Sequence, residues 1–443
     1  MTQYISSPEQ LARLKAHLAN ALAQDLERHP AAGTDLLQDA QQRLEAIFAR
    51  LSLQMEDTAR NQLLREVLDE TAAFGPIQPL LDDPTISEIM VNGPDNVFIE
   101  RNGELLETGI KFQNEDHVIR IINRMLAPLG KRVDQDTPMA DARLPGGSRA
   151  NIVIPPVSTI GPCITIRKFL RNRMTIDDLI ALEALTPHMA EFLQACVAAR
   201  LNILISGATS SGKTTFLNVL SSFIPERERV VTIEDAVELQ LRQKHVITME
   251  TRPPSVDGTG AVTTRDLVRN ALRMRPDRII VGEVRSAEAL DMLQALNTGH
   301  TGSLTTLHAN TPRDATSRLE TMVLMAGLEL PLIAIRRQIA SAINLVIHQS
   351  RLADGTRKTT QITEISGMEG DIITMSDIFK YEQTGVGPEG RIIGRLAATG
   401  LRPMFTPRLE VVGYKLRPEI FGGPGARNPE GTVNAERRSP GRG

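Results

Sequence analysis

Residues 207–215, which read GATSSGKTT, carry the clearest chemical pattern in this chain of 443 residues. They fit G-x-x-x-x-G-K-[ST], follow an apolar run typical of a strand, and open a segment typical of a helix. The glycines let successive backbone N–H groups point inward around an anion, and the helix N-terminus adds partial positive charge. We therefore predict a phosphate-binding loop for ATP, comprising Gly207, Ala208, Thr209, Ser210, Ser211, Gly212, Lys213, Thr214 and Thr215.

Two side chains at the end of this loop have specific expected roles. Lys213 should reach the β- and γ-phosphates, and the Thr214 hydroxyl is placed to ligate Mg²⁺. The alternative is a glycine-rich turn with a chance Lys-Thr pair, which the strand before it and the helix after it argue against.

An acidic residue ends the apolar run in RPDRIIVGEVR, residues 275–285. Its carboxylate, Glu283, could hold Mg²⁺ or a water of the Mg²⁺ shell. An aspartate is more usual at such a position, so the Gly-Glu ending indicates a subgroup. Taken alone, Glu283 could equally be a solvated loop residue, but beside a phosphate-binding loop a catalytic role is favoured.

Three acids gather where another apolar run ends, in TIEDAVELQ at residues 232–240. Glu234, Asp235 and Glu238 would repel one another unless a cation or a water uses them. We predict Glu234 as the general base that orients the attacking water. Asp235 and Glu238 are equally well explained as charges at the N-terminus of a helix.

Two histidines flank the short run SLTTL within TGHTGSLTTLHANTP, residues 298–312. This run should form a strand beside the strand that leads into the phosphate loop. His300 and His308 could then sense a γ-phosphate, although a lone histidine is more often a hydrogen-bonding core residue. A metal site is not expected here, because no cysteine or further histidine accompanies them.

The elements that must position these residues follow an alternating pattern from Thr186 to about residue 350. The runs 201–206, 229–234 and 278–283 are apolar without polar alternation, as in parallel strands covered on both faces. With helices between them they predict a doubly wound α/β core, which Thr186-Pro187 opens as an N-cap and first-turn proline. Residues 350–415 should add short strands and helices.

Upstream, leucines at helical spacing after Ser7-Pro8 predict helices, and Asn102-Gly103 predicts a hairpin turn. The expected organisation is a helical segment (1–75), an α+β domain (76–170), a linker (171–185), a nucleotide-binding α/β domain (186–421) and a disordered tail (422–443).

Bulk composition excludes several classes of function. Net charge is −3 and aromatic residues make up 3%, which argues against a nucleic-acid surface built on stacking. Only Cys163 and Cys196 occur, so a four-cysteine zinc site is impossible and a reducing cytoplasm is expected. Cys196 should be a buried small hydrophobe. No apolar core of a signal peptide and no run long enough for a membrane span is seen, so any membrane contact should be peripheral.

The motifs GATSSGKTT, TIEDAVE, IIVGEVR and TGHTGSLTTLHANTP, in this order, resemble the Walker A, Asp box, atypical Walker B and His box of the type II/IV secretion ATPase superfamily. The flanking segments EIMVNGPDNVFIERNGEL, DARLPGGSR, ITIRKF, RDLVRNALRMRPDRIIVGEVR and MEGDIITMSDIFKYEQTG look like the CpaF-type ATPases of the Tad/Flp (type IVc) pilus system. The resemblance runs from about Phe74 to about Phe421. Thr301 departs from it, because many Tad relatives carry an acid there.

The resemblance implies a RecA-like P-loop ATPase domain that forms a cytoplasmic homo-hexamer docked on an inner-membrane platform protein. It also implies that arginines of the N-terminal domain approach the triphosphate like arginine fingers, which by motif position are Arg143, Arg149 and Arg167. Ordinary surface or salt-bridge arginines are the alternative. The relatives couple ATP hydrolysis to pilin extrusion, and in some to retraction.

Three other functions stay open at this stage. A DNA-transfer or other type IV secretion motor would share the ATPase chemistry. A nucleotide-binding assembly platform without hydrolysis is opposed by the set of Lys213, Thr214, Glu234 and Glu283. A small-molecule kinase is opposed by the arginine-bearing upstream domain and the His box.

Overall fold

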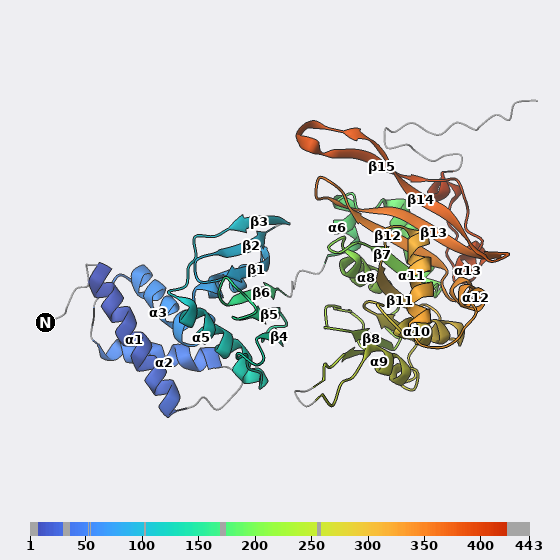
Figure 1. The fold of residues 1–443 in the computed structure, drawn as a ribbon. Helices are drawn as coiled ribbons and strands as arrows, with labels where there is room; N and C mark the ends of the chain where they lie inside the picture. Colours follow the sequence, from blue (N-terminus) through green and yellow to red (C-terminus); the bar gives the residue numbers. More distant parts are fainter. Residues whose placement is uncertain are drawn as a thin grey trace, which may run out of the picture. The chain divides into compact units, whose positions relative to one another are not determined.

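The computed structural model describes residues 8–29, 36–51, 53, 55–101, 103–168, 174–254 and 258–422. The chain divides into two compact units, Met1–Arg171 and Asn172–Gly443 (Figure 1). The segment expected as a linker, 171–185, carries helix α6 (Ile176–Ala181), which belongs to the second unit. The tail beyond residue 422 lies outside the described residues.

The first unit begins with the expected helices α1 (Pro8–Arg28), α2 (Leu36–Arg50) and α3 (Asp57–Thr71). Their buried leucines at helical spacing, Leu18 and Leu22 among them, form one small core. Ser7, the expected cap of the first helix, lies outside the described residues. None of the helices in the described ranges is long and apolar enough to span a bilayer.

An antiparallel sheet follows in the same unit, in the order β3-β2-β1-β6-β5-β4. Helix α5 packs its apolar stripe against this sheet, and the Asn114 side chain caps it by accepting from the His117 N–H. The bounds of these elements are η1 (Gly75–Ile77), α4 (Gln78–Asp82), β1 (Ile86–Asn92), β2 (Val97–Arg101), β3 (Glu104–Glu107), α5 (Glu115–Leu126), η2 (Ala127–Leu129), β4 (Met139–Arg143), β5 (Arg149–Val153) and β6 (Cys163–Arg167). Strands β2 and β3 pair as the expected hairpin, although Asn102 of its turn is outside the described residues.

The second unit is built on a mixed sheet in the order β15-β14-β13-β12-β7-β11-β10-β8-β9. The run from β12 to β9 is parallel, while β13, β14 and β15 are added antiparallel at one edge. The bounds are α7 (Pro187–Ala198), β7 (Ile203–Gly207), α8 (Lys213–Ser221), β8 (Val230–Glu234), β9 (Val246–Glu250), α9 (Thr264–Ala271), β10 (Arg278–Val281), α10 (Glu288–Asn297), β11 (Leu304–His308), α11 (Pro312–Leu324), α12 (Leu332–Ala342), β12 (Leu345–Arg351), β13 (Arg357–Glu369), β14 (Ile372–Val386), η3 (Pro388–Gly390), β15 (Ile392–Ala398), α13 (Thr406–Val411) and η4 (Pro418–Phe421). The α/β prediction is confirmed, and so is the pairing of SLTTL (β11) with the strand before the loop.

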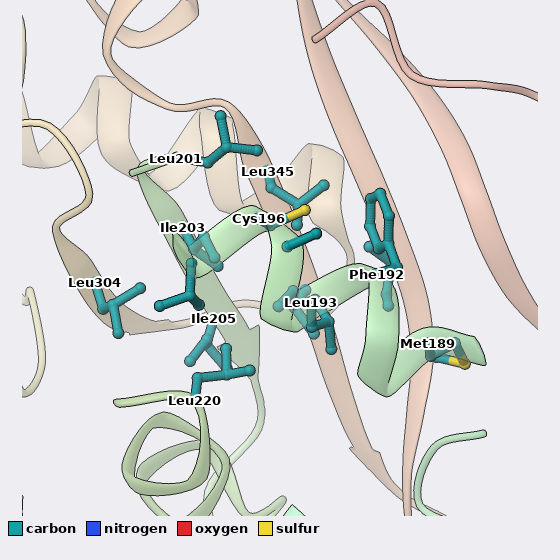
Figure 2. Packing of buried hydrophobic residues seen from close by; sticks show 14 of the residues in the cluster. Met189, Phe192, Leu193, Cys196, Leu201, Ile203, Ile205, Leu220, Leu304 and Leu345 are labelled. Atoms are coloured by element: carbon teal, nitrogen blue, oxygen red, sulfur yellow. The ribbon is translucent and has the colours of Figure 1, made fainter. Parts of the chain in front are cut away.

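Both faces of the central strands are buried, which is why their sequences lack polar alternation. Ile203 and Ile205 of β7 face a core shared with α7 and α8, whereas Leu204 between them faces a core shared with α10, α11 and α12. Figure 2 shows Cys196 of α7 in the first of these cores with Leu193 and Leu345. The cysteine is fully buried, as its apolar neighbours predict, and burial raises the pKa of its thiol.

The strands after residue 350 are not short, contrary to the sequence-based expectation. β13 has 13 residues and β14 has 15, and with β15 they form a hairpin arm that extends past the body of this unit (Figure 1). Gly367 does not end its strand, because the strand absorbs it at a shift in register with β14. A β-bulge of this kind lets a glycine lie inside a long strand.

Candidate functional site

The glycine-rich loop joins β7 to α8 at the carboxyl edge of the parallel strands. Gly207 lies between His308 of β11 and Gln349 of β12 in the sheet register, and a Cβ atom added to it would lie 2.3 Å from the Gln349 carbonyl oxygen. Gly212, with φ of 95°, is the N-cap of α8. Glycine is therefore required at 207 by close backbone approach and favoured at 212 by the left-handed conformation.

Lys213 is the first residue of α8 and is buried. Its ammonium donates to the carbonyl oxygen of Ala208, 2.9 Å away within its own loop. It also lies 3.4 Å from Nδ1 of His308 at the end of β11. The loop therefore folds around its own lysine, with the second histidine of the His box beside it.

His308 connects this lysine to Glu283. Its Nε2 lies 2.6 Å from Oε1 of Glu283. Burial, and then the charge of Lys213, lower the pKa of His308, so the ring is neutral near pH 7. A neutral ring with its proton on Nε2 presents the lone pair of Nδ1 to Lys213. The contact of Nε2 with Glu283 is close but is not a hydrogen bond, because Oε1 of Glu283 is buried without a hydrogen-bond partner among the described residues.

Arginine and aspartate extend this chain of polar groups. Arg285 Nε donates to Oε2 of Glu283 at 2.6 Å, and Arg285 Nη1 lies 2.9 Å from Oδ2 of Asp235. The residues after β8 form a loop, so Asp235 is not the first-turn charge of a helix that follows its strand. Instead, Asp235 balances the charge of Arg285 and thereby orients Glu283.

Glu234 ends β8 and is buried. Its Oε2 accepts from the backbone N–H groups of Glu238 and Leu239 at 2.8 and 2.9 Å, and its Oε1 is buried without a hydrogen-bond partner among the described residues. Burial raises the pKa of its carboxyl to about 7, although the two N–H groups favour the charged form. Its carboxylate therefore has one anchored oxygen and one oxygen available for a water.

The neighbouring strand leaves room for Glu234 by ending in glycine. A Cβ atom on Gly282 would lie 2.9 Å from Cγ of Glu234. Gly282 is itself held in place, because its N–H donates to Ile233 and its carbonyl accepts from the Thr306 hydroxyl at 2.6 Å. Because residue 282 is a glycine, the side chain of Glu234 can pack against its backbone, directly before Glu283.

The structure does not bring His300 to this site. His300 comes before the first residue of β11 and His308 is the last residue of that strand, so they lie at opposite ends of the strand. The strand itself spans about 13 Å at about 3.3 Å per residue. The carbonyl of His300 accepts from the Ser303 hydroxyl, and its N–H donates to Ala295. Of the two histidines predicted to sense a γ-phosphate, only His308 lies at the phosphate loop within the second unit.

The three predicted arginine fingers lie on the sheet of the first unit and share one row. Arg143 pairs with Arg149 between β4 and β5, and Arg149 pairs with Arg167 between β5 and β6. Adjacent like charges on neighbouring strands repel one another. The row continues to Glu88 of β1, which pairs with Arg167, so an acidic residue adjoins the three arginines.

Comparison with known proteins gives this arrangement a family. The family model described as type II/IV secretion system protein matches residues 70–385 of the chain. This chain belongs to that family. The type IV secretion system protein VirB11 of Brucella suis is 33% identical over 310 residues, which cover 63% of this chain and 86% of VirB11.

Other relatives carry different names. A putative conjugal transfer protein of Mycobacterium tuberculosis is 37% identical over 315 residues, covering 70% of this chain and 89% of that protein. Among solved structures, the VirB11 ATPase of Brucella suis in complex with sulphate is 30% identical with a TM-score of 0.36, covering 65% of this chain and 94% of VirB11. The pilus retraction motor PilT with bound ADP is 22% identical with a TM-score of 0.47, covering 63% and 79%.

The residues around the phosphate loop have the chemistry needed to bind a nucleotide together with Mg²⁺. Ser211 Oγ is buried without a hydrogen-bond partner among the described residues, as is Oε1 of Glu234. Thr214 lies half-buried in the first turn of α8, next in sequence to Lys213, which contacts His308, and His308 in turn contacts the carboxylate of Glu283. Hydroxyl and carboxylate oxygens are suitable ligands for Mg²⁺, directly or through water. The remaining loop residues, Ala208, Thr209, Ser210 and Thr215, lie on the loop and the first turn of α8.

Sequence reasoning missed several residues of the site. Arg285 and Gly282 were visible within IIVGEVR, but only the fold shows that they orient Glu283 and make room for Glu234. Gln349 and Arg357 come from strands far along the chain, and no local pattern connects them to the phosphate loop.

Proposed function

We propose that this chain is a motor ATPase that hydrolyses ATP with Mg²⁺ to drive assembly of a Tad/Flp-type pilus. The observation that carries the ATPase proposal is the continuous contact from Lys213 through His308 to Glu283, beside the buried and partly unsatisfied Glu234. A phosphate ligand, a sensor and a base are the groups that hydrolysis of a nucleotide requires.

Each side chain has a defined role in this proposal. Lys213 exchanges its contact with the Ala208 carbonyl for the β- and γ-phosphates. Glu234 holds the attacking water on its second oxygen and takes its proton, and its pKa of about 7 suits this task near neutral pH. Bound Mg²⁺ would neutralise charge on the phosphates, with Thr214 and Glu283 as the residues that hold it. His308, between Lys213 and Glu283, would report loss of the γ-phosphate to β11.

The arginine row complements the site. Arg143, Arg149 and Arg167 would stabilise charge on the triphosphate in the transition state when the first unit, of the same or a neighbouring subunit, approaches it. We propose a homo-hexamer, peripheral at the inner membrane, that passes domain motion to a platform protein. The family membership and the segments resembling CpaF-type ATPases support this assignment.

A second candidate is a motor for conjugal DNA transfer or another type IV secretion machine. The names of the Mycobacterium tuberculosis and Brucella suis relatives favour it. The net charge of −3 and the few aromatic residues favour the pilus proposal instead. Strong, salt-sensitive stimulation of ATP hydrolysis by single-stranded DNA would favour DNA transfer.

The pilus assignment is tested in the source organism. The gene is deleted and restored as wild type or as Lys213→Ala, and surface fibres are imaged. Fibres with wild type and none with Lys213→Ala are expected. Unchanged fibres in the deletion strain would overturn the pilus assignment and leave the ATPase proposal standing.

A further inference from the structure

The turn between β12 and β13 lies against the phosphate loop, although about 140 residues of sequence separate them. Arg357, the first residue of β13, donates from Nε to the carbonyl oxygen of Ser210 at 2.9 Å. A Cβ atom on Gly212 would lie 3.5 Å from Cδ of the same arginine. The Arg357 side chain therefore crosses the outside of the loop from Ser210 to Gly212.

Ser210 has an unusual backbone conformation for its residue type. Its φ is 58°, in the left-handed region that residues with a Cβ atom rarely adopt. Such a residue persists only where its surroundings hold it. The conformation matters, because alternation of left- and right-handed residues turns successive N–H groups toward one anion.

We propose that Arg357 is a positioning residue for the phosphate cradle. Its charged hydrogen bond to the Ser210 carbonyl holds Ser210 in the left-handed conformation, so that the loop is shaped for phosphate before a nucleotide binds. This inference rests on the proposed function only in taking the ligand to be a nucleotide. Loss of the contact would lower the fraction of protein whose loop can bind, and apparent affinity falls in proportion to that fraction.

The turn that carries Arg357 is itself fixed on two sides. Asp354 Oδ1 accepts from the Thr356 N–H and hydroxyl at 3.0 and 2.6 Å, and Asp354 Oδ2 accepts from the Ile392 N–H of β15 at 2.8 Å. The pKa of Asp354 is lowered, first by the Thr356 hydroxyl and then by the Ile392 N–H. Arg357 therefore reaches the loop from a constrained turn rather than from a free hairpin end.

The test measures ADP binding by calorimetry in wild type, Arg357→Ala, Ser210→Gly and the double variant. Arg357→Ala is expected to weaken ADP binding about tenfold, which corresponds to about 1.4 kcal/mol. In the Ser210→Gly background, Arg357→Ala should weaken ADP binding less than threefold, because glycine adopts the left-handed conformation without support from a neighbouring side chain. In the wild-type background kcat should change less than twofold while KM for ATP rises. Arg395→Ala, an exposed arginine that pairs with Glu382 on the arm, is the matched control and should change nothing.

Hydrogen–deuterium exchange of residues 207–212 without nucleotide gives a second readout. Faster exchange in Arg357→Ala, and wild-type exchange in Arg395→Ala, are expected from a loop that has lost its support. If Arg357→Ala costs the same ADP affinity in the wild-type and the Ser210→Gly backgrounds, the positioning role is overturned in favour of a direct phosphate contact. Unchanged affinity and unchanged exchange would overturn it altogether. If wild type binds no nucleotide, the proposed function fails, and the exchange measurement still decides the role of Arg357.

Discussion

At the scale of single residues, the site depends on how one carboxylate is buried. Glu234 has one oxygen fixed by two backbone N–H groups and the other buried without a partner among the described residues. Burial also raises its pKa to about 7. In its proposed role as general base Glu234 needs its charged form, so the burial that raises its pKa would set a lower limit on the working pH.

Glu234→Gln should lower kcat at least about 100-fold and leave ADP binding intact, since a general base accelerates a reaction about 10²–10⁴-fold. In wild type, kcat/KM should fall about tenfold per pH unit below pH 7, because protonation of Glu234 removes the base. Steady-state kinetics across pH 5.5–9 provide the measurement, with ADP calorimetry as the control. Retained turnover in Glu234→Gln would assign the base to another residue.

Glu234→Gln should lower activity but increase the stability of the fold at pH 8. The folded-state pKa of Glu234 is raised, so its contribution to stability is full below pH 4.5 and is lost as pH rises through about 7. At pH 8 the neutral glutamine should therefore increase the free energy of unfolding by about 3 kcal/mol, and at pH 4 the difference should vanish. Urea unfolding at both pH values tests this, and a destabilised variant at pH 8 would contradict it.

At the scale of elements, one buried arginine joins three segments. Arg278, at the start of β10, is fully buried and pairs with Glu228. It also donates to the carbonyls of Val197, at the end of α7, and Gly302, in the loop before β11, at 2.8 and 3.1 Å. The central strands β10 and β11 thus have their starting ends fixed at the edge opposite the phosphate loop.

Arg278→Ala should lower the free energy of unfolding by about 3–5 kcal/mol, because, among the described residues, it leaves the buried Glu228 with only Arg200, whose Nη1 lies 3.9 Å from its Oε1. Urea unfolding of the full chain measures the change. The exposed pair of Arg395 and Glu382 provides the comparison, since Arg395→Ala should cost less than about 1 kcal/mol. Similar costs for the two variants would mean that the buried pair does not support the sheet.

The sequence predicts the elements near the phosphate loop well because each carries a local signal. The apolar runs at β7, β8 and β10 indicate strands buried on both faces, and the structure confirms them. The separation of His300 from His308 could have been foreseen from the length of SLTTL, since two residues at opposite ends of a strand cannot share an edge. The contact of Arg357 with Ser210 could not, because it depends on how β12 returns to lie beside β7.

At the scale of the whole molecule, the groups proposed for catalysis belong to two compact units. Lys213, Glu234, Glu283 and His308 belong to the second unit, and the arginine row belongs to the first. Each unit has its own buried core. The proposal therefore requires nucleotide binding by one unit and full turnover only when a first unit supplies its arginines.

Arg149→Ala should leave ADP binding within about twofold of wild type and lower kcat by about 10³, as expected for an arginine finger. Arg149 is the central member of the row, between Arg143 and Arg167. Arg101→Ala, which removes an arginine paired with Asp83 on the same sheet, is the control and should retain turnover. Unchanged turnover in Arg149→Ala would remove this arginine from the proposed mechanism.

The most direct test of the central claim is ATP hydrolysis by the purified protein with Mg²⁺, in wild type and Lys213→Ala. The contact of Lys213 with His308 and the loop around it predict hydrolysis by wild type and a loss of at least about 100-fold in the variant, with an unchanged melting temperature as evidence of folding. No hydrolysis by the wild-type protein, or equal rates in both proteins, would contradict the account.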